Sequence, residues 1–364
     1  MRRLIWMLLS VFLIPMTSIA FAQGIATATH KFMLAGLGQT SFISEEGENS
    51  TVETAFEPIF LYSVNDRLLF EGEVEAEIED GGQAFNLEYA QLLYVVNDYI
   101  VIGGGKFLNP SDFFMERLHP AWINKLPDKP FFQHEETKLQ APTHIGFQVR
   151  GAIPAGSSKI EYAAYMGNGP IYVPDDMILE FDNFGDNNSD KVVGGRVSFL
   201  PVPQVEIGYG VETAKVGDKD SEFSDVRELS NTVDFTYVSK ISSLKGGVDI
   251  RAQASWLQLQ NIPTGNSATV DKTSKGGYAQ IAYHPYNAAS PVLKNIEIAY
   301  RFDWFDPPDD VPMNAKLTRS AFGLSYWLSS SSAIKLAFET TTEDVPGENN
   351  ATTNRFIGQL AIGF

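Results

Sequence analysis

Acidic side chains occupy every second position from Glu71 to Glu79, and this spacing is the clearest candidate for chemistry in the sequence. Side chains two residues apart in a β-strand point to the same face, with about 6.6 Å between them. Rows of carboxylates along a water-filled pore attract cations. We therefore predict a cation-attracting wall, and the alternative is an ordinary solvated strand face. The candidate wall residues are Glu71, Glu73, Glu75 and Glu77.

Basic residues follow the same alternation in other parts of the chain. If the alternating segments enclose one lumen, these residues would face it together with the glutamates. Three charged residues of a long connection, Asp112, Glu116 and Arg117, are the further candidates, and we expect them to stand opposite basic residues of the wall. The predicted basic lumen residues are Lys106, Arg150, Arg196, Arg251 and Arg301.

The elements that must hold these side chains read as strands. Period-two alternation recurs in sixteen segments, from about His30 to Phe364, and the last of them runs from Asn354 to the end of the chain. Short connections such as Asn65-Asp66 and Asn97-Asp98 alternate with long ones, and Asn and Asp tolerate the backbone angles of tight turns. An even number of strands with short turns at one end and long loops at the other is typical of transmembrane barrels. We predict an all-β, antiparallel up-and-down barrel of about sixteen strands.

Composition is consistent with a barrel outside the cytoplasm. Residues 1–22 have a basic start, an apolar core and an Ala-Phe-Ala site, which predicts a signal peptide and a mature chain over residues 23–364. Mean hydropathy is −0.11, so strands rather than helices would have to cross a membrane. Cysteine is absent and the formal net charge is −18, which argues against thiol chemistry and against nucleic acid as a partner.

Two other patterns in the sequence bear on metal binding and on hydrolysis. The acidic stretch around Asp175 to Asp190 offers oxygen ligands for calcium, but position twelve counted from Asp182 is Val193 and not glutamate. Among the five histidines, His144 has the parity of a lumen residue, yet no serine can be assigned to it from the sequence. We predict no metal, no cofactor and no enzyme activity; a barrel-embedded hydrolase is the weaker alternative.

Two features resemble known families. The alternating terminal strand that ends in Phe364 resembles the C-terminal signal of Gram-negative outer-membrane barrels, which implies recognition by the barrel-assembly machinery. Residues 103–110 (GGGKFLNP), 168–170 (NGP), 182–191 and 195–197 (GRV) resemble the phosphate-selective porin O/P-like family, most clearly over residues 67–200. This likeness implies a trimeric sixteen-stranded channel whose lumen arginines and lysines select phosphate. The acidic row of this chain departs from that pattern.

The connection from Asn109 to Pro142 follows the fifth segment and is rich in aromatic residues. In general sixteen-stranded porins the loop at this place folds into the lumen, so the resemblance implies a constriction loop over residues 109–142; a surface lid is the alternative. We predict an outer-membrane porin for passive diffusion of small hydrophilic solutes or ions, embedded in outer-membrane lipid and possibly a homotrimer. A structural or adhesion barrel with a plugged lumen is the main alternative.

Overall fold

The structure is a computed structural model that describes residues 31–79, 81–134, 137–175, 178–181, 184–264, 268–308 and 315–364. The predicted signal peptide lies outside these residues. Among them, no helix has both the length and the apolar character that a membrane crossing requires.

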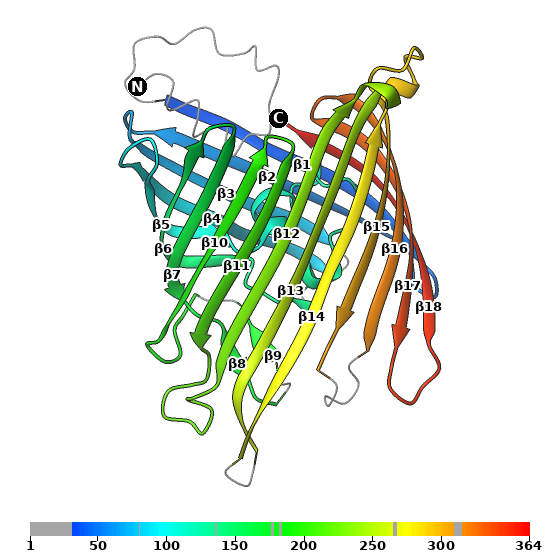
Figure 1. The fold of residues 1–364 in the computed structure, drawn as a ribbon. Coiled ribbons are helices and arrows are strands. Elements are labelled where there is room, and N and C mark those ends of the chain that lie inside the picture. The colour runs from blue at the N-terminus through cyan, green and yellow to red at the C-terminus, as the bar shows by residue number, and fades with distance from the viewer. Residues whose placement is uncertain are drawn as a thin grey trace.

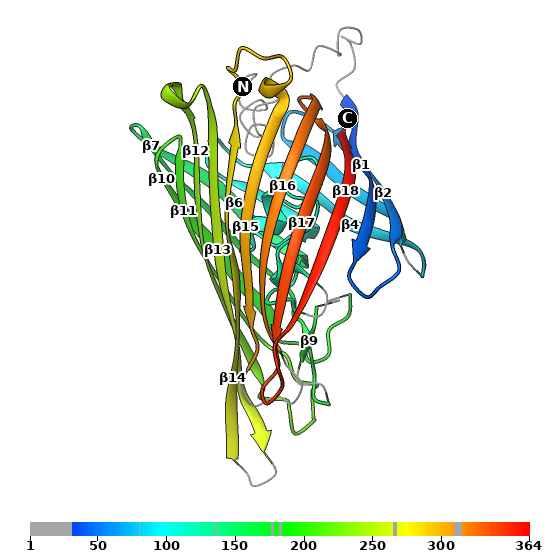
Figure 2. The ribbon, with the colours of Figure 1, turned by 90° about the vertical axis from the view of Figure 1, so that its right-hand side faces the viewer.

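Sixteen antiparallel strands form one closed barrel, as predicted, and a separate two-stranded hairpin, β8–β9, lies outside the barrel ladder. Each barrel strand pairs with its neighbours in the chain, except that β7 pairs with β10 because the hairpin intervenes. Figure 1 shows the tight hairpins and the C-terminus at one end and the long connections at the other, and Figure 2 shows how far β13 and β14 extend. The barrel strands are β1 (Lys31–Glu45), β2 (Thr51–Ser63), β3 (Leu68–Glu79), β4 (Gly82–Val95), β5 (Val101–Leu108), β6 (Thr143–Ala155), β7 (Ser158–Asn168), β10 (Lys191–Val202), β11 (Val205–Lys215), β12 (Arg227–Ile241), β13 (Gly246–Thr264), β14 (Ala268–His284), β15 (Ile296–Asp306), β16 (Lys316–Ser329), β17 (Ser332–Asp344) and β18 (Ala351–Gly363).

The short elements all lie in connections. The loop between β5 and β6 contains helix α2 and the 3-10 turn η1, and the loop between β7 and β10 contains β8 and β9. The latter loop was expected to have no regular structure, because three-residue strands are too short to give a period-two signal. The bounds are α2 (Phe113–Arg117), η1 (Phe131–Gln133), β8 (Ile171–Val173), β9 (Ile178–Glu180), η3 (Ser242–Leu244) and η4 (Leu293–Asn295).

The barrel is apolar outside and polar inside. In β17, Ile334 and Phe338 on the outer face are 45% and 51% exposed, whereas Lys335 and Glu339 on the inner face are each 1% exposed. Alternate residues of a strand point to opposite faces, so the sequence alternation transfers directly to the two sides of the wall. The inner face therefore carries the charged side chains of the barrel.

The first and last strands close the barrel. β1 pairs with β18 from Leu37 opposite Gly363 to Glu45 opposite Arg355, as the terminal alternation predicts. Beyond the ladder, Phe364 and Gly36 exchange two backbone hydrogen bonds of 3.0 Å, and the Phe364 ring stacks on Phe56 at 6.0 Å. A Cβ at Gly36 would come within 2.7 Å of this ring. Glycine at position 36 thus leaves room for the terminal phenylalanine.

Turn chemistry sets the register at the tight end. The Asn65 side chain accepts from the N–H groups of Arg67 and Leu68 at 2.8 and 3.0 Å, and Asn97 does the same for the two residues after Asp98. Both turns were predicted. The irregularity expected near Trp256 lies slightly further along, between Leu259 and Ile262.

Asn261 explains this displacement. It has a left-handed backbone with φ of 60° in the part of β13 where the register with β14 shifts. Asparagine tolerates this conformation better than most residues, so the ladder breaks there.

Candidate functional site in the lumen

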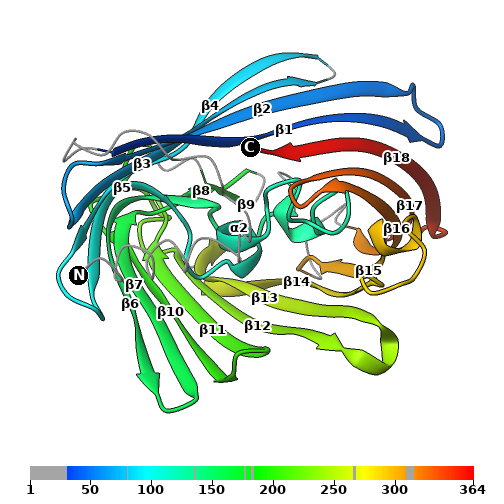
Figure 3. The same cartoon turned by 90° about the horizontal axis from the view of Figure 1, so that it is seen from above.

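The connection between β5 and β6 runs inside the barrel, and Figure 3 shows α2 between the wall of β1 and β2 and the wall of β13 and β14. The two ends of the loop meet, because Asn109 N–H donates to Pro142 O at 2.9 Å. Its aromatic side chains are packed, as their number predicted. One apolar cluster joins the loop to the wall and to the loops between β7 and β10 and between β11 and β12. Its members are Phe113, Phe114, Leu118, Phe132 and Leu139 of the first loop and Tyr172, Leu179, Val192, Ala214, Val216, Val226, Leu257, Leu259, Ile262 and Tyr278 of the other parts.

Asp112 holds the start of α2 and is fully buried at 1% exposure. Its Oδ1 accepts from Phe114 N–H at 3.1 Å and Met115 N–H at 3.3 Å, so it is the N-cap of the helix. The amides of Gln253 and Gln133 donate to the same carboxylate at 2.9 and 2.6 Å. Burial raises the pKa of Asp112, and the hydrogen bonds act against that shift. The structure therefore places this predicted pore residue in a positioning role.

Glu116, at the end of α2, meets a basic wall residue of the kind expected to oppose it, whereas Arg117 meets acidic wall residues. Glu116 forms an ion pair with Arg150 of β6. Arg117 donates to Glu161 of β7 at 2.8 Å and to Glu206 of β11 at 3.1 Å. Although burial opposes ionisation of Glu116, the neighbouring Arg150 and Arg117 outweigh it and lower its pKa. The loop is thus fixed to one side of the barrel by charge pairs.

Arg196 of β10 belongs to the same group. Its guanidinium donates to Asp234 at 2.7 Å and to Glu206 at 2.9 Å, and it lies over the Phe113 ring at 5.2 Å. Arg196 is only 5% exposed. Each of the three arginines, Arg117, Arg150 and Arg196, therefore has at least one carboxylate beside it, which compensates its positive charge.

A second attachment is formed by three arginines, called here the arginine clamp: Arg301 of β15, Arg319 of β16 and Arg355 of β18. Arg301 donates to the carbonyl of Asp128 at 3.0 Å, and Arg319 donates to the Asp128 carboxylate at 2.5 Å and to the carbonyl of Lys129 at 2.6 Å. Arg355 also pairs with Asp128. Of these residues, sequence reasoning had selected Arg301 alone as a site residue.

The tip of the loop reaches the closing strands. Lys335 of β17 donates to the carbonyls of Ala121 and Asn124. Ala121 and Trp122 pack against Leu37 of β1 and Ala361 of β18. The docking surface of this loop segment therefore consists of residues from both ends of the chain.

Two predicted basic residues lie apart from these groups. Arg251 pairs with Asp249 on its own strand at 2.7 Å. Lys106 donates to the carbonyl of Leu87 at 2.6 Å, and its ammonium lies 5.3 Å from the centre of the Phe184 ring. Their contribution to the pore lining stays a prediction.

The predicted glutamate row lies on the inner face of β3, as its parity requires. Glu71 accepts from Gln91 at 2.7 Å and is buried, as is Glu73, whereas Glu75 and Glu77 are half-buried. The exposed Lys129 of the loop lies within electrostatic range of Glu75. The row therefore faces the loop across the lumen, while the ion pairs of the loop run to other strands.

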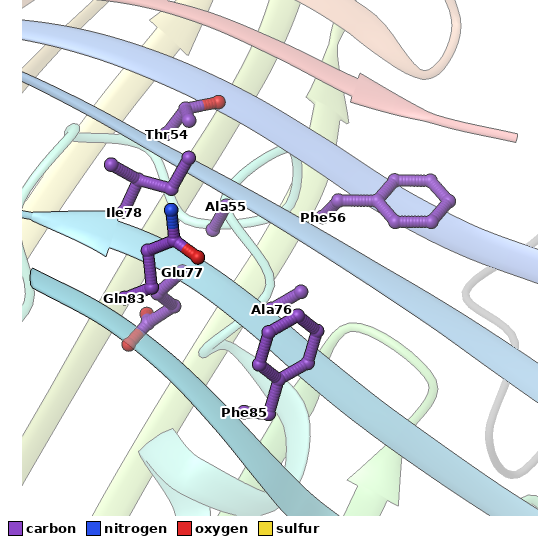
Figure 4. Close-up of a pocket in the computed structure, with 8 residues that line it drawn as sticks. All are labelled: Thr54, Ala55, Phe56, Ala76, Glu77, Ile78, Gln83 and Phe85. Carbon is purple, nitrogen blue, oxygen red and sulfur yellow. The ribbon is translucent and has the colours of Figure 1, made fainter.

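A depression of about 190 Å³ lies on the other side of this wall. Phe56, Ala76 and Phe85 form one cross-strand row, and Figure 4 shows the two rings on either side of the alanine. Phe56 and Phe85 are 53% and 76% exposed on the outer face. The depression therefore belongs mainly to the outer surface of the barrel, not to the lumen site.

His144 lies in a closed polar cluster at the base of the loop. Its Nε2 is 3.1 Å from Glu212 Oε2, which also accepts from Tyr165 at 2.5 Å, and the Tyr165 hydroxyl lies 2.9 Å from Ser111 Oγ. His144 and Ser111 have no exposed surface. Because Ser111 is buried, a substrate cannot reach its hydroxyl group. The cluster therefore gives no support to a hydrolase.

Sequence reasoning did not find Asp128 or Arg355 as site residues. Alternation already put Arg355 on the polar side of the last strand, so parity could have selected it. Asp128 carries no such signal, because its position depends on the path of the loop through the barrel.

Fold and site together define a closed sixteen-stranded barrel whose long loop between β5 and β6 is attached to the inner face of the wall. No protein-family model and no curated protein sequence matches this chain. Solved structures do match. An anion-selective porin from Comamonas acidovorans aligns with a TM-score of 0.60 at 11% identity, over 92% of this chain and 100% of that one.

Two further solved structures align with this chain over most of its length. OprB of Pseudomonas putida aligns with a TM-score of 0.59 at 10% identity, over 92% of this chain and 94% of that one. The outer membrane channel DcaP of Acinetobacter baumannii aligns with a TM-score of 0.57 at 14% identity, over 94% of this chain and 100% of that one. The chain therefore has the fold of the outer-membrane porins.

The arginine clamp gives a prediction on acid sensitivity. Burial opposes ionisation of Asp128, but His134, Arg355 and Arg319 hold its pKa well below the usual range. A depressed pKa in the folded state means that the contribution of Asp128 is complete above the unfolded value, about 3.9, and is lost as pH falls through the folded value. The contribution of Asp128 to holding the loop should therefore be lost only below about pH 4, where single-channel recordings should show increased current noise.

Asp128→Asn tests the same point at neutral pH, since it removes the charge and keeps the size. Single-channel recordings of this variant at pH 7 should show the current fluctuations that the native chain shows only in stronger acid. The matched control is Asp218→Asn in the loop between β11 and β12. Equal noise in the native chain and Asp128→Asn would contradict a role for this carboxylate in holding the loop.

Proposed function

We propose that this chain is an outer-membrane porin through which small hydrophilic solutes diffuse passively, with a mild preference for cations. The observation that supports this proposal most directly is the arrangement of charge in the lumen. The constriction loop is tied to β6, β7, β11 and β15 to β18, while the half-buried Glu75 and Glu77 face it from β3. Solutes would pass between the loop and this acidic wall.

The compensated arginines support cation over phosphate preference. Arg117, Arg196 and Arg301 each donate to at least one carboxylate of the barrel, at 2.8, 2.7 and 3.0 Å respectively. A paired guanidinium leaves little free positive charge for a passing anion. The resemblance to the phosphate-selective porin O/P-like family thus supports a porin, and we do not extend its phosphate preference to this chain.

The remaining assignments are part of the same proposal. The apolar outer face would contact outer-membrane lipid, the signal peptide of residues 1–22 would direct export, and the terminal strand would be read by the barrel-assembly machinery. A homotrimer is the proposed assembly. Several porins with this fold support the outer membrane as the location.

Reversal potentials in a salt gradient test the charge preference. The native channel should favour potassium over chloride, and the double variant Glu75→Gln with Glu77→Gln should lower that ratio severalfold, because it removes two charges from the wall. Glu348→Gln, in an exposed turn, serves as the control. A native preference for chloride would overturn this part of the proposal.

A plugged structural barrel is the second candidate, since the apolar cluster joins both inward loops to the wall. Single-channel recording separates the two functions. Stepwise conductance supports the porin, and its absence with correctly inserted protein supports the plugged barrel.

A further inference from the structure

The hydrogen-bond ladder between β2 and β3 is interrupted at Pro58. The antiparallel register sets Pro58 opposite Val74 and Glu57 opposite Glu75. Proline has no N–H group and therefore gives no ladder hydrogen bond. Glu57 and Glu75 both project into the lumen at this point, one from each strand.

The ladder between β3 and β4 is irregular at the same level. Glu73 pairs with Tyr89 and Val74 with Leu87, so Glu88 is an extra residue on β4. Such a β-bulge redirects side chains and is frequent beside functional sites. Here it brings a further carboxylate to residues 73–75 of β3.

Four carboxylates meet where the two irregularities coincide: Glu57, Glu73, Glu75 and Glu88. Glu57 lies within electrostatic range of the other three. Glu57 and Glu73 are 6% and 1% exposed, whereas Glu75 and Glu88 are half-buried and can be reached from the lumen. Ionisation of one of these carboxylates disfavours ionisation of its neighbours, and a cation placed between them would offset that repulsion.

Glu73 supplies a second observation at this place. One oxygen of its carboxylate interacts with the Tyr89 hydroxyl, while the other, Oε1, is buried and has no hydrogen-bond partner. A buried acceptor of this kind is costly unless a donor or a cation reaches it.

We propose that Glu57, Glu73, Glu75 and Glu88 form a binding site for small organic cations that carry primary ammonium groups. The inference rests on the proposed porin function and names a solute class for it. Among the residues that the structure describes, no three carboxylate or imidazole groups are placed to coordinate a metal ion. An ammonium group has three donors and can bridge carboxylates that stand too far apart for direct metal coordination.

Lys129 supports the choice of an ammonium. This exposed side chain of the loop lies within electrostatic range of Glu75. A solute amine would compete with it for the same carboxylate. Lys129→Met should therefore strengthen binding of the solute, whereas loss of a carboxylate should weaken it.

Spermidine is the probe, and two measurements are made on the full-length protein. Calorimetric titration into the folded protein in detergent measures binding, and added spermidine in planar bilayers should produce brief current blockades. Glu73→Gln and Glu88→Gln should each weaken binding about tenfold, as expected for one lost charge contact. Glu348→Gln is the matched control, and heat-modifiable mobility on gels verifies folding of every variant.

The outcomes distinguish this site from the porin function. Spermidine binding without any channel conductance would retain the site and overturn the porin. Conductance with neither binding heat nor blockade would retain the porin and overturn the site. Stronger, Glu73-dependent binding of Mg²⁺ at equal concentration would overturn the assignment to organic cations.

Discussion

Replacing residues 112–139 with a short glycine-serine link should raise the single-channel conductance several-fold. The replacement is geometrically simple, because Asn109 and Pro142 are already joined by a backbone hydrogen bond. It removes α2, the aromatic side chains of the loop and the segment held by the arginine clamp. A sixteen-stranded barrel without an inserted segment encloses a wide aqueous channel. Planar-bilayer recording in symmetric salt measures the change.

Two controls accompany the excision. Shortening the exposed turn of residues 345–350 should leave the conductance unchanged, because this turn lies outside the lumen contacts described above. The double variant Arg319→Ser with Arg355→Ser keeps the loop and weakens its attachment, so it should increase current noise more than mean conductance. A conductance that does not change after excision would show that the loop does not limit the pore.

Removing Phe364 should lower the yield of folded barrel strongly. The deletion removes the stacking on Phe56 and the two backbone hydrogen bonds with Gly36, together worth roughly 2–4 kcal/mol. Heat-modifiable mobility after expression, and refolding into lipid vesicles without cellular machinery, measure the loss.

Gly36→Val separates the structural role of Phe364 from its role as a signal. The added side chain would occupy the space of the Phe364 ring, would also meet the backbone carbonyl of Glu57 in β2, and leaves the C-terminal sequence intact. Poor refolding of Gly36→Val in vesicles supports a role in closing the barrel. Normal refolding of both variants, with poor assembly in cells for the deletion alone, would assign Phe364 to targeting and not to closure.

The barrel was predictable because its rules are local. Period-two alternation defined the strands, and Asn65 and Asn97 defined tight turns through hydrogen bonds to residues two and three positions ahead. The hairpin β8–β9 was missed because it is stabilised by packing of Tyr172 and Leu179 in the shared apolar cluster. That cluster brings together parts of the chain whose proximity no local pattern reveals.

The site was predictable only in part, for the same reason. Loop position and parity predicted that Glu116 and Arg117 stand opposite basic wall residues. Glu116 does meet Arg150, whereas Arg117 meets Glu206, which it shares with Arg196. The carboxylates that compensate these arginines were not foreseen as their partners. Which acid meets which base depends on barrel stagger and on the path of the loop, and neither is encoded in a single strand.

The contact of Ala121 and Trp122 with Leu37 and Ala361 links the loop tip to the closure of the barrel. Leu37 belongs to the first strand and Ala361 to the last, so the complete docking surface exists only where β1 is paired with β18. A variant that weakens this pairing should therefore also loosen the loop tip, although it changes no residue of the loop.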